Sequence, residues 1–577
     1  MGVPALFSNV VRTHPNIIKT LGGVTVCQPS KKHTASAKTK LYHNLYLDSN
    51  SIVYDCVHRM QGSSQGKTND QTIIDAVCKQ IHSYIKLVKP TETVIIAFDG
   101  VAPVAKLENQ RNRRYKSEFT ASIMEKAGVV KNSWDTTAIT PGTPFMERLD
   151  SGLNSYFATN GTQNRFGAKQ VIVSSSFQAG EGEHKIFEFI RSNPAKHQEE
   201  RTVIYGLDAD LIMLSINHLH YCPNLFLFRE TPHFIRSLNK SLDPGELYVL
   251  DINELFAGVC NNIYGRVKHK NPDYKTSVLP YDYVFLVSLL GNDYMPHNPA
   301  FSIRTGGLDV VIGAYRKFIE ITRSRALPGS LLTDGEHINW DNFRTYMRTL
   351  AVMEEDLFLK EHKHRESLAK RPFSLRKDNS RRSSNSNSND KDKEISLEDE
   401  MTQRLNAIPV YNREKEKYID PTEPYWQERY YVALLGGKRK TVGPSVCASY
   451  LEALEWTMRY YTSGCANWRW AYPYAYAPLF SDLLEHIPSS GSALPERQKL
   501  DSTPVSPITQ LSYVLPVSAQ HMLPANVRNE LRDKLEDKYG TNWEFEWSYC
   551  RYFWESHAIM PHIDVDYLER LVSKCGK

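Results

Sequence analysis

The stretch GEGEHKIFEFI, residues 180–190, places two glutamates between glycines immediately before a helical pattern. Carboxylates in a first helical turn commonly offset the positive end of the helix dipole and bind free backbone N–H groups. For Glu181 and Glu183 taken alone, this structural explanation is favoured, because acidic helix starts are common. Further acids in comparable places would instead indicate a site that performs chemistry.

Acidic residues also end several short apolar runs in the N-terminal half of the chain. LYLD ends at Asp48, VIIAFD at Asp99 and TVIYGLD at Asp208, and each run predicts a buried strand. DAD adds Asp210, and LLGND closes an apolar, helix-like run with Asp293. Seven clustered carboxylates would repel one another unless several were protonated or cations were bound. Such hard oxygen ligands suit Mg²⁺ or Mn²⁺, particularly as two ions that bridge a phosphodiester.

The elements that position these acids alternate between strands and helices. The clearest helical pattern is IIDAVCKQIHSYIKLV, residues 73–88, where apolar residues recur at helical spacing. This alternation predicts an α/β fold with a mainly parallel central sheet flanked by helices. The carboxyl ends of parallel strands lie along one edge, where open α/β folds bind ligands. A cap or surface charge explains any single acid equally well, but five segments ending at one edge favour a metal site.

A basic face follows the second of these strands, in the stretch DGVAPVAKLENQRNRRYK. If the stretch is helical, Lys106, Gln110, Arg113 and Arg114 fall within an arc of about 100°. A solvated surface is the usual explanation for such a face. Its position a few residues after Asp99 instead favours capture of a phosphate, with arginine making bidentate contacts.

These motifs together resemble the XRN family of 5′→3′ exoribonucleases. The matching stretches in the first half are MGVPALF, LYLDSNSIVYDCVH, FDGVAPVAKLENQRNRR, GEGEHKIFEFIR, YGLDADLIML and LGNDYMPHNP. In the second half they are GCANWRWAYPYAYAPLFSDL, SYVLPVSAQHMLP and MPHIDVDYL. The resemblance implies a PIN/FEN-like nuclease core in which all seven acids bind the catalytic metals. These acids are Asp48, Asp99, Glu181, Glu183, Asp208, Asp210 and Asp293.

The resemblance also assigns the basic face to a pocket for a 5′ monophosphate. It implies processive 5′→3′ hydrolysis of 5′-monophosphorylated single-stranded RNA to nucleoside 5′-monophosphates, in RNA decay or processing. Two Mg²⁺ or Mn²⁺ ions would assist the hydrolysis. The chain lacks the long C-terminal extension of the large cytoplasmic members, so we do not expect the partners that bind such extensions. We also expect a monomer.

Three positions depart from the family pattern. Tyr54 stands in place of a histidine that stacks on the first base, and an aromatic ring there can still stack. Val104 replaces an arginine and Ala179 replaces a proline. The family arrangement implies that Trp468 or Trp470 pairs with Tyr54 to clamp that base, and the sequence does not distinguish the two tryptophans.

The composition changes between the two halves of the resemblance. Few apolar residues occur from about residue 361, and Ser, Asn and charged residues predominate, so we predict a disordered linker over residues 361–410. It would separate a nuclease core, 1–360, from an aromatic-rich region, 411–577, that completes the substrate channel. The linker's basic half could act in nuclear import or contact RNA, although a solvated linker is the simpler explanation. Its cations are Arg371, Arg376, Lys377, Arg381 and Arg382.

The aromatic-rich region contains the stretch NWRWAYPYAYAP, in which rings recur at every second residue. This alternation predicts an extended segment with one set of rings on each face. Packing in the core is the favoured explanation for most of these rings. They are Trp468, Trp470, Tyr472, Tyr474 and Tyr476.

Composition limits the remaining interpretations. A chain of 577 residues with 41% hydrophobic content suggests two to four domains, and a net charge of +5 requires local basic clusters for any nucleic-acid binding. Nine cysteines without a CxxC pair resemble neither a disulfide framework nor a zinc site and favour a reducing compartment. No apolar run is long enough to cross a membrane. We therefore expect an intracellular protein, with the cytoplasm favoured over the nucleus.

Two other functions are consistent with the acidic edge. A flap-type or other structure-specific DNA nuclease could share it, but we find no convincing helix-hairpin-helix for duplex DNA in the sequence. A catalytically weak RNA-binding scaffold could also descend from a nuclease. The complete acidic set argues against the scaffold.

Overall fold

The computed structural model of the chain describes most of its length, and every structural statement below concerns the described residues. They are 6–21, 41–61, 69–129, 134–157, 166–206, 208–228, 246–264, 279–324, 331–375, 395–493, 503–540 and 544–575. None of the helices in these ranges combines the length and apolar character needed to cross a membrane.

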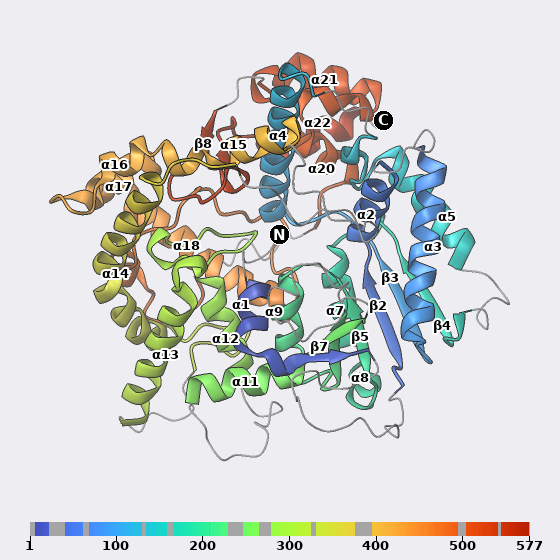
Figure 1. Ribbon diagram of the computed structural model, residues 1–577, viewed down its shortest axis with the longest axis horizontal. Coiled ribbons are helices and arrows are strands. Elements are labelled where there is room, and N and C mark those ends of the chain that lie inside the picture. The colour runs from blue at the N-terminus through green and yellow to red at the C-terminus, as the bar shows by residue number, and fades with distance from the viewer. Residues whose placement is uncertain are drawn as a thin grey trace.

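A seven-stranded sheet forms the centre of the N-terminal half (Figure 1). Its order is β1-β7-β6-β5-β2-β3-β4, and the five strands from β6 to β4 pair in parallel. Only β7 and β1 at the other edge add antiparallel pairs. The predicted mainly parallel sheet is therefore confirmed. The strands are β1 (Ile18–Thr20), β2 (Asn44–Asp48), β3 (Thr93–Ala97), β4 (Gln170–Ser174), β5 (Thr202–Tyr205), β6 (Leu225–Phe228) and β7 (Tyr248–Asp251).

Both faces of this sheet are covered, which explains why its strands read as continuous apolar runs. Side chains alternate along β2, so that Leu45 and Leu47 face one core and Tyr46 faces the other. The first core packs against α2 (Asn50–Gln61), α3 (Asp70–Val88) and α5 (Pro144–Phe157). The second packs against α7 (Gly182–Ser192), α8 (Pro194–Glu199), α9 (Asp210–Asn217), α11 (Ile252–Tyr264) and α12 (Leu279–Ser288).

The predicted helix over residues 73–88 is confirmed as α3. Its apolar positions, including Ile74, Val77 and Ile81, are buried in the first core. Asn69 caps its start by accepting a hydrogen bond from the Thr72 N–H, because the first turn of a helix leaves backbone donors unpaired. The helix thereby supports the strand before it and the strand after it.

The C-terminal half is mainly helical (Figure 1) and packs against the sheet-containing half through one continuous core. Trp456, Tyr460 and Tyr461 of α18 lie in the same cluster as residues of α7 and α9. The predicted aromatic-rich region packed against the sheet domain is thus confirmed. Helix α1 (Leu6–Thr13), near the N-terminus, packs into the same core. The helices of the C-terminal half, with those that lead to it, are α13 (Gly307–Ser324), α14 (Trp340–Ala369), α15 (Leu397–Tyr411), α16 (Glu414–Ile419), α17 (Trp426–Leu434), α18 (Arg439–Thr462), α19 (Phe480–His486), α20 (Pro507–Val514), α21 (Ala525–Leu535) and α22 (Val565–Cys575).

The predicted linker over residues 361–410 is too long at both ends. Helix α14 continues to Ala369, and α15 covers residues 397–411. The reason is a buried ion pair: Arg365 Nη2 lies 2.6 Å from Glu416 Oε1, and both side chains are shielded from solvent. Composition alone does not distinguish charged residues that are buried in ion pairs from charged residues that are solvated. The cations Arg376, Lys377, Arg381 and Arg382 lie outside the described residues.

The segment around residues 468–476 forms no regular helix or strand in the described structure. The alternation of its rings predicted an extended segment with one set of rings on each face. Trp470, Tyr472 and Tyr476 are buried in the core, whereas Trp468 and Tyr474 are half-buried. The rings therefore do not divide evenly between two faces. Core packing accounts for most of them.

The helix that follows Asp99, α4 (Val104–Lys126), joins the two halves of the chain. Figure 1 shows it extending toward the C-terminal helices, and it contacts α20. Arg111, on a different face from the predicted phosphate-binding residues, is 1% exposed. Its guanidinium donates to the carbonyls of Pro561 (3.0 Å) and Lys538 (2.9 Å) and lies against the ring of Tyr513.

Replacing Arg111 with alanine should destabilise the protein by about 2–4 kcal/mol, because two carbonyl acceptors lose a charged donor inside the core. Urea unfolding followed by tryptophan fluorescence measures the change. Arg532→Ala, which removes an exposed guanidinium from α21, is the control and should leave the midpoint unchanged. Equal midpoints for the two variants would show that Arg111 does not hold the halves together.

Candidate active site

The seven acids predicted to bind metal converge at the carboxyl edge of the sheet. Asp48 ends β2, Asp99 follows β3, and Asp208 follows β5. Burial, and then the nearby charges of Asp99, Asp208 and Glu181, raise the pKa of Asp48 well above its ordinary value. Burial and the charges of Asp208 and Asp293 likewise raise the pKa of Asp210. The edge therefore forms one acidic cluster.

The glycines in GEGE allow the chain to enter this cluster. Gly180 adopts a φ of +102°, a conformation that side chains rarely allow. The Gly182 N–H donates to Asp99 Oδ1 at 2.7 Å. A Cβ at Gly182 would lie only 2.8 Å from Asp48 Oδ1, so no larger residue fits without moving that carboxylate. The two glycines thus bring the start of α7 against the ends of β2 and β3.

Glu181 does not act as the helix cap that its position alone suggests. It is the N-cap residue of α7, yet its side chain makes no capping hydrogen bond. Instead Oε1 accepts hydrogen bonds from the hydroxyls of Tyr294 and Tyr460, each at 2.9 Å, and Oε2 lies 2.9 Å from Lys106 Nζ. Burial opposes ionisation, but the charge of Lys106 and the hydrogen bonds from Lys106 and Tyr460 outweigh it and lower the pKa of Glu181. This carboxylate is therefore held charged.

Lys106, predicted to bind a terminal phosphate, lies within the acidic cluster. Its ammonium pairs with both Glu181 and Asp293 and is almost completely buried. Asn109 Nδ2 also donates to Asp293 Oδ1 at 3.0 Å, and Arg113 Nη2 lies 4.0 Å from Asp293 Oδ2. The start of α4 therefore lies directly beside the acids, as its position after Asp99 led us to expect.

The other members of the predicted phosphate pocket lie on the next turns of α4. The Arg113 side chain is 37% exposed. Arg114 is held by a hydrogen bond from Nη2 to Thr140 Oγ1 at 2.6 Å. Burial raises the pKa of Tyr54, and the nearby charge of Arg114 offsets only part of that rise. Within the described residues, Arg114 Nε and Gln110 Oε1 are buried and make no hydrogen bond. The structure brings Tyr54 and these cations together, and their role in phosphate binding stays a prediction.

Trp468 and Trp470 are distinguished by their surroundings. Trp470 is 5% exposed, stacks on Trp456 with 5.1 Å between ring centroids, and donates from Nε1 to Glu452 Oε2 at 3.2 Å. Trp468 is half-buried, and its carbonyl accepts a hydrogen bond from the Val104 N–H at 2.9 Å, where α4 begins. Of the two rings, Trp468 is the one with a surface available for stacking.

Four of the acids have the raised pKa values expected of carboxylates that are packed together without compensating positive charge. The pKa values of Asp48, Asp99, Glu183 and Asp210 are all raised. Burial is the largest cause in each case, and repulsion from neighbouring carboxylates is the next. Asp210 is 0% exposed, and neither of its carboxylate oxygens has a hydrogen-bond partner within the described part of the chain. A buried carboxylate in this condition needs either a proton or a cation.

This donor set fits hard divalent cations in its chemistry, since every member offers carboxylate oxygens. Across the described ranges, no three Asp, Glu, His or Cys side chains already stand in metal-binding geometry. Three of the acids instead contact protein groups: Glu181 and Asp293 pair with Lys106, and Asp99 accepts hydrogen bonds from Asn50 and the Gly182 N–H. Metal binding by these residues stays a prediction.

Several residues of the site were not found from the sequence. Asn50 Nδ2 donates to Asp99 Oδ2 at 2.7 Å, and its Oδ1 accepts from the Asp99 N–H at 3.2 Å. His184 stacks on Tyr460 with 3.7 Å between ring centroids, and burial lowers its pKa to about 3, so the ring is neutral. Asn50 lies two residues after Asp48, and Tyr294 directly follows Asp293. This closeness in sequence to predicted acids could have identified both residues. Nothing in the sequence links Tyr460 to Glu181.

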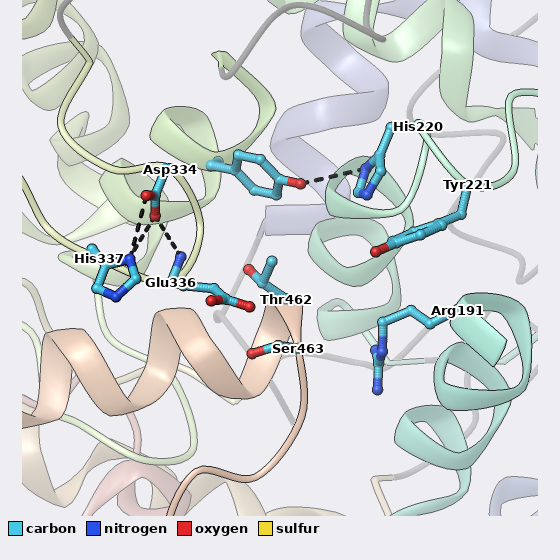
Figure 2. A pocket seen from close by; sticks show the side chains of 9 residues that line it. Arg191, His220, Tyr221, Asp334, Glu336, His337, Thr462 and Ser463 are labelled. Carbon is cyan, nitrogen blue, oxygen red and sulfur yellow. Dashed lines mark hydrogen bonds and ion pairs between the residues drawn. The ribbon is translucent and has the colours of Figure 1, made fainter. Parts of the chain in front are cut away.

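A separate pocket of about 330 Å³ lies at the far ends of α7 and α18, away from the acids. Figure 2 shows Arg191 and His220 on one side of it and Asp334 and Glu336 on the other. None of the seven acids lines this pocket. The acidic cluster at the sheet edge is therefore the candidate active site.

The sheet topology and the acidic cluster at its carboxyl edge define an α/β domain of the nuclease type, joined to a helical, aromatic-rich region. Residues 1–231 match the family described as XRN 5′-3′ exonuclease N-terminus, and residues 274–576 match the Xrn1 helical domain. The chain belongs to the XRN family.

Similar proteins support this assignment along almost the whole chain. The chain is 27% identical to "5'-3' exoribonuclease 2 homolog" of Drosophila melanogaster, with 98% of this chain and 70% of that protein covered. It is 26% identical to "5'-3' exoribonuclease 2" of Debaryomyces hansenii, with 100% and 70% covered. The protein of the same name from Gallus gallus is also 26% identical, with 98% and 69% covered.

Proposed function

We propose that this protein is a divalent-metal-dependent 5′→3′ exoribonuclease that processively degrades 5′-monophosphorylated single-stranded RNA to nucleoside 5′-monophosphates. The observation that carries the proposal is the contact between the acidic cluster and the basic face of α4, made by Lys106 with Glu181 and Asp293. A phosphodiester needs acids to hold cations and a nearby cationic surface to hold its phosphates. The relatives named exoribonucleases support RNA as the substrate.

The acids would hold two Mg²⁺ or Mn²⁺ ions. These ions, when bound, would supply the charge that activates water and stabilises the leaving 3′ oxygen. Tyr294 and Tyr460 keep Glu181 ionised and oriented through their hydrogen bonds. Asn50 fixes the orientation of Asp99. The chain's own residues thus preorganise the acids before substrate arrives.

Selection of the 5′ end would depend on α4 and on two aromatic rings. Arg113 is exposed enough to form a bidentate contact with a terminal phosphate, and Arg114 is fixed behind it by Thr140. Tyr54 and Trp468 would hold the first base between them by stacking. Each hydrolysis would present a new 5′ phosphate to the same pocket, which favours processive movement.

The direct test incubates the purified protein with Mg²⁺ and matched RNAs that carry a 5′ monophosphate, hydroxyl, triphosphate or cap. We expect only the monophosphorylated RNA to be converted efficiently to mononucleotides, with no accumulation of intermediate lengths. Asp208→Ala is the control and should remove most activity. Equal degradation of all four RNAs would contradict the phosphate pocket.

The same assay separates the alternative functions. Preferential cleavage of a branched or flapped DNA would indicate a structure-specific DNA nuclease. Binding of RNA without hydrolysis, together with no binding of Mg²⁺ by calorimetry, would indicate a scaffold. We also propose that the active form is a monomer, which light scattering coupled to size-exclusion chromatography measures.

A further inference from the structure

Two exposed aromatic rings lie on the C-terminal region, outside the residues assigned above. Tyr552 and Trp554 stack in parallel, with ring centroids 5.9 Å apart and an interplanar angle of 13°, and are 36% and 37% exposed. The guanidinium of Arg304 lies 5.4 Å from the Tyr552 ring and 5.7 Å from the Trp554 ring. That of Arg551 lies 5.4 Å from Tyr552. We call these four residues the aromatic platform.

The platform is held in place from beneath. Glu555 pairs with Arg304 through Oε1, and its Oε2 accepts hydrogen bonds from the N–H groups of Arg551 (2.7 Å) and Tyr552 (3.3 Å). Phe553, between the two exposed rings in sequence, is buried and packs against Phe119 of α4. Packing thus requires Phe553 to point inward, whereas the neighbouring rings are presented to solvent.

The platform contacts α4, the helix that carries the basic face. The Trp554 carbonyl accepts a hydrogen bond from Lys116 Nζ at 2.6 Å. Lys116 and Lys106 lie on the same helix, ten residues apart, which corresponds to about 15 Å along its axis. Burial lowers the pKa of His297, in the segment that follows Asp293, and the charge of Arg304 lowers it further. The platform is therefore joined to the acidic cluster through one helix, at a point about three turns beyond Lys106.

We propose that the aromatic platform binds single-stranded RNA on the 3′ side of the nucleotide being removed. This inference rests on the proposed function and extends it to a second RNA contact. Bases stack on aromatic side chains without sequence preference, and arginine adds cation–π contacts and attraction to phosphates. With a net charge of only +5, the chain needs such local contacts to retain RNA. The platform would keep the RNA bound while each new 5′ end moves into the pocket.

The test measures RNA affinity in an Asp208→Ala background, so that substrate is not consumed. Fluorescence anisotropy is recorded with 5′-monophosphorylated RNAs of about 4 and about 16 nucleotides. Trp554→Ala should weaken binding of the longer RNA about tenfold and leave the shorter RNA unaffected. Tyr418→Ala, which removes an exposed ring from α16, is the matched control and should change neither affinity. Photo-crosslinking of RNA containing 5-iodouridine should also label Tyr552 or Trp554.

The outcomes distinguish this inference from the proposed function. If the Asp208→Ala protein binds neither RNA, the proposed function fails. If it binds both RNAs and Trp554→Ala changes neither affinity, with no crosslink to the platform, the platform is not an RNA site and the proposed function stands. Thermal unfolding shows whether Trp554→Ala is folded, and Arg304→Gln provides a second variant with the same expected dependence on RNA length.

Discussion

Replacing Asp210 with asparagine is expected to lower RNA hydrolysis by about 10³-fold while making the protein harder to unfold. The activity loss follows if this carboxylate holds a catalytic cation, because such a cation contributes about 4 kcal/mol to the transition state. The gain in stability follows from the structure. Both oxygens of Asp210 are buried without a hydrogen-bond partner in the described part of the chain, and the acids around it would accept hydrogen bonds from an amide.

The pH dependence of this stability gain has a defined sign. Burial and the charges of Asp208 and Asp293 raise the pKa of Asp210 in the folded protein. The unfolded chain releases this proton above a pH of about 4, whereas the folded protein keeps it to a higher pH. The free energy of unfolding therefore falls as the pH rises from the unfolded-state pKa to the raised folded-state pKa. Asp210→Asn lacks this contribution. Its advantage in unfolding free energy, measured in chelator, should grow as the pH rises above about 4.

Asp282→Asn is the matched control for this experiment. Asp282 is also a buried acid, but it lies outside the cluster and accepts hydrogen bonds from the N–H groups of Leu332 (3.0 Å) and Thr333 (2.9 Å). Its substitution should reduce stability, because an amide cannot accept all the same hydrogen bonds, and should leave activity per folded molecule unchanged. If Asp210→Asn behaved in the same way, Asp210 would be a structural residue.

The sheet and its acidic edge could be predicted because short-range patterns determine them. Each parallel strand is buried on both faces, so β2, β3 and β5 appear as apolar runs, and an acid follows each run where the chain leaves the sheet. The antiparallel edge formed by β7 and β1 could not be predicted, since strand order depends on contacts between segments far apart in sequence. Helix periodicity predicted α3 for the same local reason, whereas a helix after Asp99 was an assumption that α4 bears out.

The partners of the acids could not be predicted, because they come from distant parts of the chain. Tyr460 reaches Glu181 from α18, across 279 positions in sequence, and nothing in the local pattern of either residue indicates the contact. Lys106 was expected on a phosphate-binding surface, yet it also neutralises two of the acids. Trp468 and Trp470 are similar in sequence, and only packing against Trp456 identifies the buried one.

Replacing Arg113 with alanine is expected to remove the preference for a 5′ monophosphate. The Arg113 side chain is 37% exposed, and its ion pair with Asp293, at 4.0 Å, is long. Its removal should therefore leave the fold and the acids intact, unlike removal of Lys106, whose ammonium is buried between two carboxylates. A charged hydrogen bond to a phosphate contributes about 2–3 kcal/mol, so kcat/KM for the monophosphorylated RNA should fall about 10²-fold.

The informative quantity is the change in kcat/KM for monophosphorylated RNA relative to the same RNA with a 5′ hydroxyl. If Arg113 binds the terminal phosphate, the variant loses activity only on the first RNA, because the second has no group for the guanidinium to contact. Arg532→Ala, which removes an exposed arginine from α21, should preserve both rates. Equal losses on the two RNAs would instead mean that Arg113 acts through Asp293 on hydrolysis itself, and the 5′ selectivity would have to arise from Arg114, Gln110 and the stacking rings.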